Sequence, residues 1–322
     1  MRARPSSFIG STDAQGLERM FFGLVENALE EHLDGRASRV AIHISETGQV
    51  TIEDDGAGIA IDVPGGLARI DRLARLGEKR KTDRRVRINS ESNGRRVAVV
   101  NALSSRFELE SRRLGNSTRV VFERGELIEP LGQPSPRQVT DGTRIQYQPD
   151  PEIFGDALLR VDHVADQLQE LAWLCPKLDL RLQDRSLQGG LCPFIEHLAG
   201  DDLVKESLVQ VREEVDGVRV EVALGWKRSG VEAGVRSFVN FRSSVSGSHV
   251  DAVFSALRPS SSLARARNSL RGLVAVVHVG IEWVHLEDGI LDLPPVRRAV
   301  HAAIRHVLES GAPWWKRHLT AH

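Results

Sequence analysis

The 322-residue sequence has only two cysteines, Cys175 and Cys192, and they stand in no metal-ligand spacing. This scarcity argues against a disulfide framework and against a cysteine-held metal, and it fits the reducing cytoplasm. Long hydrophobic runs are missing too, because no apolar stretch approaches the roughly 20 residues that span a bilayer. The first residues hold no apolar run of signal-peptide length. We therefore expect a cytoplasmic protein without a membrane partner.

The sequence also lacks an excess of charge of one sign. Its formal net charge is -1, so no overall field draws the protein to nucleic acid or to an anionic membrane, and DNA binding is not indicated. Basic residues gather only locally, at 78–87, within a polar stretch that we interpret as a long loop over 78–96. This run fits either a solvated loop or a patch for an anion, a nucleic acid or an acidic partner.

What the sequence does contain is hydrophobic periodicity that changes character near residue 200. Apolar residues at helical spacing predict a helix over 17–33, and alternating residues predict two strands before a turn-like loop at 54–58. The other helices expected in the first part are 65–77, 97–103 and 156–175, and the strands are 39–45, 49–53, 106–112, 117–123, 142–149 and 178–184. Later we expect strands over 208–215, 218–227, 234–239 and 272–281 and helices over 249–257 and 295–308. The fold class is therefore α+β, with one layered domain over 1–200 and another over 201–322.

Four segments resemble one protein family in sequence, order and spacing. They are Arg4–Asp13 (RPSSFIGSTD), Leu24–Glu31 (LVENALEE), Thr51–Ile59 (TIEDDGAGI) and Val97–Ser104 (VAVVNALS). Together they resemble the ATP-binding region of the DNA gyrase B-subunit and the topoisomerase IV E-subunit, and residues 141–143, 188–194, 220–226 and 240–249 continue the match. One such motif would be a weak signal, but collinear motifs are specific.

The resemblance implies a fold and a domain layout. It implies a GHKL nucleotide-binding domain (the Bergerat α/β sandwich) over 1–200, followed by a transducer-like domain of ribosomal S5-like α/β fold over 201–322. The sequence ends where that region ends, so we expect a diverged, truncated paralogue that is not a complete topoisomerase. Only three residues precede Arg4, which argues against the family's arm-swapped dimer and leaves another homodimer open.

The adenine side of the implied site is retained. Asp54 is the expected adenine reader, because a carboxylate accepts a hydrogen bond from an exocyclic amine, while Gly56 and Gly58 let the backbone approach the base. An ordinary Asp-Asp-Gly turn is the alternative interpretation. By position, the resemblance adds further cofactor-binding residues: Ile59, Arg113 and Thr143.

The phosphate side departs from the family. Asn27 is the expected magnesium ligand, but Gly23 stands where the family has its glutamate base, and glycine cannot reach a proton. Glu26 and Glu30 are weak candidates for a replacement. In the lid segment only Gly94 survives, and Arg95 and Arg96 replace flexible residues; their side chains could contact phosphate instead.

Two further departures point the same way. Residues 286–288 (Leu-Glu-Asp) stand where the family's transducer presents a lysine to the γ-phosphate, and an acid there would repel phosphate. Ala57 replaces the arginine of the family's DDGRG run. Loss of one acid–base or electrostatic group typically costs about 10²–10⁴ in rate, so several losses together predict a site without family-type hydrolysis.

We interpret the sequence as a stand-alone, gyrase-B-like binding protein, a pseudo-ATPase that takes ATP or a related adenine-pocket ligand in a degenerate GHKL site. Its partner could be one of the gyrase subunits or a pathway enzyme, and one version is a decoy or resistance protein for inhibitors of the gyrase adenine pocket. The alternative is an ATP-dependent enzyme with divergent chemistry, phosphoryl transfer or substrate activation, in which Asn27, Glu26 or Glu30 hold magnesium. The sequence leaves enzyme and binding protein both open.

Overall fold

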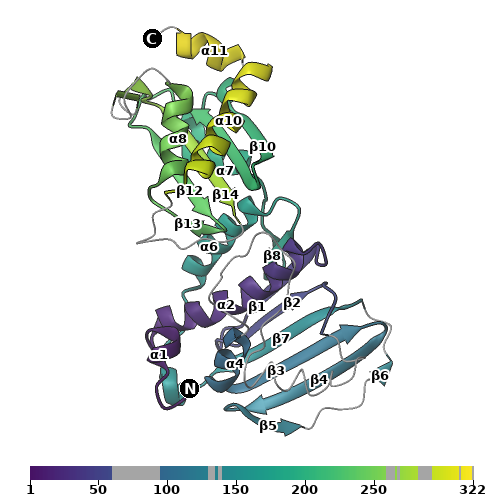
Figure 1. Ribbon diagram of the computed structural model, residues 1–322. Helices are drawn as coiled ribbons and strands as arrows, with labels where there is room; N and C mark the ends of the chain where they lie inside the picture. The colour runs from purple at the N-terminus through teal and green to yellow at the C-terminus, as the bar shows by residue number, and fades with distance from the viewer. Residues whose placement is uncertain are drawn as a thin grey trace. The chain divides into compact units, whose positions relative to one another are not determined.

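The computed structural model describes residues 1–59, 95–129, 135–136, 140–258, 265–266, 269–281, 292–311 and 313–320 (Figure 1). They form two compact units. The first contains the chain up to Ala172 together with 177–187, and the second contains Trp173–Pro176 and the chain from Gln188 onward. The functional division into 1–200 and 201–322 stays a prediction. Within the described part of the chain, no helix has the length and apolar character needed to cross a membrane.

The first unit is built on a mixed nine-stranded sheet. Its strand order is β5-β4-β3-β7-β2-β1-β8-β9, and β6 pairs with β4 off this path (Figure 1). All pairs are antiparallel except β1 with β8. The strands are β1 Arg39–Ile44, β2 Val50–Asp54, β3 Ser104–Arg113, β4 Asn116–Glu123, β5 Glu126–Glu129, β6 Ser135–Pro136, β7 Gly142–Pro149, β8 Asp179–Leu182 and β9 Arg185–Ser186.

Helices cover one face of this sheet. The long helix α2, Ala14–Leu33, is capped by Asp13, whose side chain accepts from the backbone N–H of Gln15 at 2.9 Å and of Gly16 at 3.4 Å. Apolar residues at helical spacing turn one side of α2 inward, and α4, Arg95–Ala102, packs beside it. The remaining helices of this part are α1 Ser6–Ile9, α5 Pro151–Phe154 and α6 Val161–Leu174.

On the helix-covered face, residues that are paired in register across β2, β7, β3 and β4 form three rows. These rows explain why the sheet carries a site at one end. The first two rows are apolar and buried: Val50, Tyr147, Phe107 and Phe122, then Ile52, Ile145, Leu109 and Val120. The third row starts with Val40 and becomes polar, with Asp54, Thr143, Ser111 and Thr118 all buried. Because side chains alternate between the faces of a sheet, these polar residues must point into the same layer as the core.

The second unit has a five-stranded sheet of order β10-β11-β14-β12-β13 (Figure 1). Its strands are β10 Val209–Val215, β11 Val218–Trp226, β12 Gly234–Val239, β13 Arg242–Ser243 and β14 Leu273–Gly280. One core joins this sheet to α8 Ser248–Leu257, α10 Pro294–Gly311 and α11 Pro313–Thr320, and another joins it to α7 Leu191–Ala199. Two short 3-10 helices, Gly200–Asp202 and Lys205–Ser207, lead into β10.

The structure confirms the α+β class, and most expected elements are present with shifted ends. The helix expected over 156–175 begins only at Val161 and follows the separate short helix α5, and α7 was not expected. The strand expected over 106–112 extends from Ser104 to Arg113. The helix expected over 65–77 lies outside the described residues, as does the loop expected over 78–96 up to residue 94. Residues 95 and 96 belong to α4 and not to that loop.

The tryptophans near the end of the chain belong to the core of the second unit. Trp315 is fully buried, and its indole Nε1 donates to the carbonyl oxygen of Ser207 at 2.7 Å. The Trp226 ring lies edge-on to Trp315 at 5.8 Å, and the half-buried Trp314 stacks on His318 at 4.4 Å. The start of α11 is therefore held by packing and by the buried hydrogen bond of Trp315, and its end accepts a hydrogen bond from Arg258 at the carbonyl oxygen of Leu319, 2.8 Å long.

We predict that Trp315→Ala lowers the free energy of unfolding by about 3–5 kcal/mol, because it leaves a cavity in the core and removes the hydrogen-bond donor to the Ser207 carbonyl oxygen. Urea denaturation followed by tryptophan fluorescence measures the loss. Trp314→Ala is the matched control and should cost about 1–2 kcal/mol, since that ring is only half-buried. Equal losses in the two variants would contradict the assignment of Trp315 as the anchor.

Candidate functional site

The polar row at the end of the first unit's sheet forms the floor of the candidate site. Asp54 on β2 is paired in register with Thr143 on β7, and Thr143 with Ser111 on β3. Their exposed fractions are 5% for Asp54, 8% for Thr143 and 0% for Ser111. A carboxylate and two hydroxyls thus lie side by side among apolar neighbours, where a hydrogen bond to a ligand is strong because water does not compete well.

The loop after β2 passes very close to its neighbours. The Asp54 carboxylate accepts from the backbone N–H of Gly56 at 2.9 Å. Gly58 has a φ of 66°, and a Cβ there would lie 2.3 Å from the carbonyl oxygen of Arg112. A Cβ at Gly56 would lie 2.7 Å from the Asp54 carboxylate. Both glycines are therefore required by space, and Gly58 also by its left-handed backbone.

The far end of the same loop is tied to β3. The Ser111 hydroxyl accepts from the backbone N–H of Ile59 at 2.8 Å, and the Arg113 guanidinium donates to the carbonyl oxygen of Ala57 at 2.9 Å. Arg113 thus holds the backbone at the position where the family's arginine is replaced by Ala57. Of the expected residues, Thr143 lies beside Asp54, while Ile59 contacts Ser111 and Arg113 contacts Ala57.

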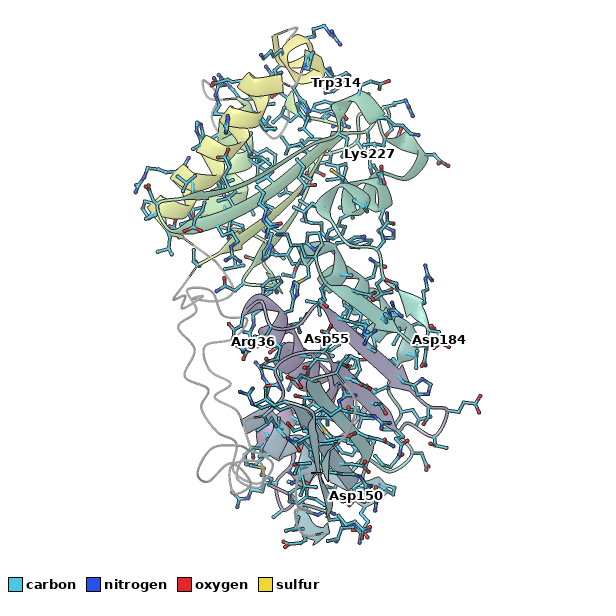
Figure 2. All side chains as sticks on the ribbon, turned by 90° about the vertical axis from the view of Figure 1, so that its right-hand side faces the viewer. Arg36, Asp55, Asp150, Asp184, Lys227 and Trp314 are labelled. Atoms are coloured by element: carbon cyan, nitrogen blue, oxygen red, sulfur yellow. The ribbon has the colours of Figure 1, made fainter. Side chains whose placement is uncertain are left out.

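Asp55 ties the start of the loop to Ser38 and Arg39, where β1 begins. Its carboxylate accepts from the backbone N–H of Ser38 at 2.8 Å, from the Ser38 hydroxyl at 2.6 Å and from the backbone N–H of Arg39 at 2.7 Å. Burial acts to raise the pKa of Asp55, but these hydrogen bonds outweigh it and hold the pKa below its ordinary value. Asp55 lies at the same end of the unit as Arg36, away from Asp150 (Figure 2).

Glu31 is a site residue that the sequence analysis missed. It is 2% exposed, and its Cβ and Cγ lie 3.1 Å from where a Cβ of Gly56 would be. Its carboxylate pairs with Arg36, with Nε–Oε2 at 2.7 Å and Nη2–Oε1 at 3.2 Å. Glu31 stands four residues after Asn27, so both lie on one face of α2, and that spacing is the signal that could have revealed it.

At the opposite end of this helix face, Arg96 of α4 lies on Gly23 and pairs with Glu26. The Arg96 Cδ is 3.2 Å, and its Cβ and Cγ are 3.5 Å, from the place where a Cβ of Gly23 would be. The guanidinium forms an ion pair with the Glu26 carboxylate, and both side chains are largely buried, at 17% and 22% exposure. Glu26 is therefore engaged by a cation and does not present an open carboxylate.

Other expected residues of the phosphate side are placed only in part. Glu30 is half-buried on α2, one residue before Glu31. Gly94, the side chain of Arg95, the basic run 78–87 and the acidic substitution at 286–288 lie outside the described residues. A role of Asn27 and Arg96 toward phosphate stays a prediction.

The magnesium ion implied by the resemblance can be tested against the donors present. Mg²⁺ takes oxygen ligands and commonly uses one or two carboxylates together with substrate phosphates. Beside Asn27, the Glu26 carboxylate is held by Arg96, whose positive charge also opposes a divalent cation. Among the described residues, no three His, Cys, Asp or Glu side chains come together as a metal site. Magnesium binding at Asn27 together with ligand phosphates stays a prediction.

Comparisons with known proteins found a matching family model and similar sequences. The family model for histidine kinase-, DNA gyrase B-, and HSP90-like ATPases matches residues 12–149. The DNA gyrase B-subunit of Thermus thermophilus is 33% identical over 256 residues, which is 74% of this chain and 40% of that protein. The type 2 topoisomerase B-subunit of Aquifex aeolicus is 31% identical over 263 residues, 77% of this chain and 33% of that protein. The chain thus spans less than half the length of these relatives.

Solved structures show the same likeness in three dimensions. The 43K ATPase domain of Thermus thermophilus gyrase B, in complex with an aminocoumarin, matches with a TM-score of 0.81 and 28% identity, over 99% of this chain and 91% of that one. The gyrase B-subunit of Myxococcus xanthus matches with a TM-score of 0.81 at 22% identity, which shows the fold alone. The expected fold, a GHKL sandwich with a transducer domain, is confirmed.

We predict that Gly58→Ala costs more than about 2 kcal/mol of unfolding free energy, because the new methyl group would overlap the carbonyl of Arg112 in a strained backbone. Gly35→Ala is the matched control, since Gly35 has a φ of 72° with open space around its Cβ position. It should cost only the left-handed strain, about 1–2 kcal/mol. Urea denaturation of both variants measures the loss of unfolding free energy. If Gly58→Ala loses no more than Gly35→Ala, the close contact between Gly58 and the Arg112 carbonyl is contradicted.

We also predict that the stabilisation by Asp55 depends on pH. A carboxyl whose folded pKa is depressed stabilises the fold above its unfolded pKa of about 3.9 and loses that effect as the pH falls through the folded pKa. Asp55→Asn should therefore be less stable than the wild type at pH 6, and the gap should narrow below about pH 4. Urea denaturation at several pH values measures the gap, and a gap independent of pH would overturn the assignment.

Proposed function

The chain is a GHKL-superfamily homologue of the ATPase and transducer region of the DNA gyrase B-subunit and the topoisomerase IV E-subunit, and we propose that it binds ATP or a related adenine ligand without family-type hydrolysis. The observation that carries the proposal is the buried row of Asp54, Thr143 and Ser111 beside the glycine loop. We also propose that the protein acts in the cytoplasm.

Adenine matches the chemistry of that row. Its exocyclic amine is a donor, and a carboxylate such as Asp54 offers only acceptors. Its ring nitrogens are acceptors, which the hydroxyl of Thr143 can satisfy as a donor. Asp54 is 5% exposed, and because position 56 is glycine the loop projects no side chain over the Asp54 carboxylate.

The lack of a side chain at position 23 supports binding without family-type turnover. A general base must lie within about 3 Å of the proton that it removes, or reach it through one water. Gly23 has no side chain, the stem of Arg96 covers it, and Glu26 is held in an ion pair. A carboxylate paired with a guanidinium is a weaker base, because the positive charge stabilises its ionised form.

Isothermal titration calorimetry with ATP and ADP tests the proposal on the full chain. The wild type should bind both, and Asp54→Asn should weaken binding at least about tenfold, since a hydrogen bond to a charged group contributes about 1.5–3 kcal/mol. Asp184→Asn, an exposed residue after β8 (Figure 2), is the control and should bind like the wild type. Absence of heat with both nucleotides would refute nucleotide binding.

Phosphate release in the same samples tests the second half of the proposal. ATP should remain intact over the time in which an active gyrase-type ATPase turns over. Sustained release that Asp54→Asn abolishes would show that hydrolysis persists and would favour the alternative of an enzyme. Release unchanged in Asp54→Asn would instead identify a contaminating activity.

A second candidate ligand is an inhibitor of the gyrase adenine pocket. The related Thermus thermophilus ATPase domain was solved in complex with an aminocoumarin, and the floor residues Asp54 and Thr143 are buried and in register here. Binding of such a compound would support a decoy or resistance role beside gyrase. Isothermal titration calorimetry with an aminocoumarin as the titrant tests this binding. Asp54→Asn should weaken it.

A further inference from the structure

The chain between α2 and β1, residues 34–39, lies against the start of the loop after β2. The Asp55 carboxylate accepts three hydrogen bonds from this connection. Arg36, in the middle of the connection, pairs with Glu31, and Glu31 packs on Gly56. Figure 2 shows Arg36 and Asp55 at the same end of the unit. The same short connection therefore contacts the loop directly through Asp55 and indirectly through Glu31.

Glu31 and Asp54 bring two acidic side chains to one buried place. Their exposed fractions are 2% and 5%. The Glu31 Cγ lies 3.1 Å and the Asp54 Oδ1 lies 2.7 Å from the same point, the Cβ position of Gly56. Like charges that are close together repel, and burial strengthens the repulsion because water and salt screen it less. A positive charge beside either carboxylate therefore stabilises the arrangement.

Arg36 places a positive charge on Glu31. Its guanidinium donates from Nε to Oε2 at 2.7 Å and from Nη2 to Oε1 at 3.2 Å, which is the two-point geometry of a strong charge-assisted pair. The hydrogen bond and the charge of Glu31 raise the pKa of Arg36 although burial acts to lower it. Gly35, with a φ of 72°, turns the chain back, and the Arg36 backbone N–H donates to the Glu31 carbonyl oxygen at 2.9 Å.

We propose that Arg36 is a positioning residue of the adenine site, which balances the charge of Glu31 and holds that side chain against Gly56 so that Asp54 keeps the place in which it meets the base. The inference rests on the proposed function. Arg36 is not one of the floor residues, and it acts on Asp54 through Glu31. Without the guanidinium, the charge of Glu31 would lose this buried partner, and a movement of the loop or of Glu31 would relieve the repulsion.

Isothermal titration calorimetry with ADP measures this effect on the full chain. Arg36→Gln should weaken ADP binding about tenfold, because the repulsion between Glu31 and Asp54 is then unbalanced. Glu31→Gln combined with Arg36→Gln removes the repelling charge as well, so the double variant should bind ADP within about threefold of the wild type. A role of Arg36 through contacts of its own, independent of Glu31, would not give this recovery.

Arg160→Gln is the matched control. Arg160 pairs with Glu18, another buried acid of α2, in the same two-point geometry, from Nε at 2.8 Å and from Nη2 at 3.1 Å. Glu18 stands about 20 Å before Glu31 along the helix, at a rise of roughly 1.5 Å per residue. This variant should therefore bind ADP within about twofold of the wild type. Thermal unfolding identifies a temperature at which every variant is folded, and affinity measured there reports on the site.

Arg36→Lys keeps the comparison possible if Arg36→Gln does not fold. Lysine retains the charge, but it cannot reproduce the rigid two-point contact of a guanidinium. We expect Arg36→Lys to fold and to weaken ADP binding about threefold. An affinity equal to that of the wild type would contradict the role of Arg36.

Different outcomes overturn different claims. If the wild type does not bind ADP, the proposed function fails and this inference fails with it. If the wild type binds ADP and Arg36→Gln binds it equally well, the role of Arg36 is wrong while the adenine site stands. Equal losses of affinity in Arg36→Gln and Arg160→Gln, or no recovery in the double variant, likewise overturn the inference.

Discussion

The close passage of Gly58 over the carbonyl of Arg112 is the constraint on which the adenine side of the site depends. It brings the loop after β2 against β3, so that Ser111 can hold both backbone groups of Ile59 and Arg113 can reach Ala57. With the loop held there, Asp54 remains buried and aligned with Thr143 instead of turning to solvent. A rigid, dehydrated acceptor needs little reorganisation when a base arrives, which is the physical basis of affinity in a small polar pocket.

The phosphate side is organised by a different interaction, the ion pair between Arg96 and Glu26. An ion pair that is largely buried is costly to form, because both charges lose water, and it persists only when geometry and neighbours compensate. Here the bare surface of Gly23 lets the arginine stem lie flat on α2. The middle and the C-terminal end of α2 therefore each hold an ion pair, Glu26 with Arg96 and Glu31 with Arg36.

The sequence allowed prediction of the features that local pattern encodes. Helical spacing located α2, strand alternation located β2 and β7, and the Asp-Asp-Gly run located the loop with its two close glycines. Contacts between segments that are distant in the chain could not be predicted from the sequence. Arg96 meets Glu26 across 70 positions of chain, and Ser111 meets Ile59 across 52. Neither contact leaves a periodic signal, because each depends on how two elements pack.

The unexpected helix α7 shows a further limit. Its segment, Leu191–Ala199, contains Pro193 and follows Gly190, so local signals favour a loop. Proline is tolerated in the first turn of a helix, where its missing N–H has no partner to lose. The burial of Phe194 and Ile195 against β11 and β14 then stabilises the helix. Tertiary packing outweighed propensity, and only the structure reveals such a balance.

The arrangement around Arg96 also bears on why binding and hydrolysis need not occur together. Catalysis requires interactions that strengthen in the transition state relative to the ground state. Position 23 has no side chain that could take a proton from water, and the guanidinium packed on it is paired with Glu26. A contact to adenine that is the same in the ground state and in the transition state raises affinity, and without a base at position 23 it leaves the chemical barrier in place. The proposed adenine site is therefore better suited to retaining a nucleotide than to cleaving it.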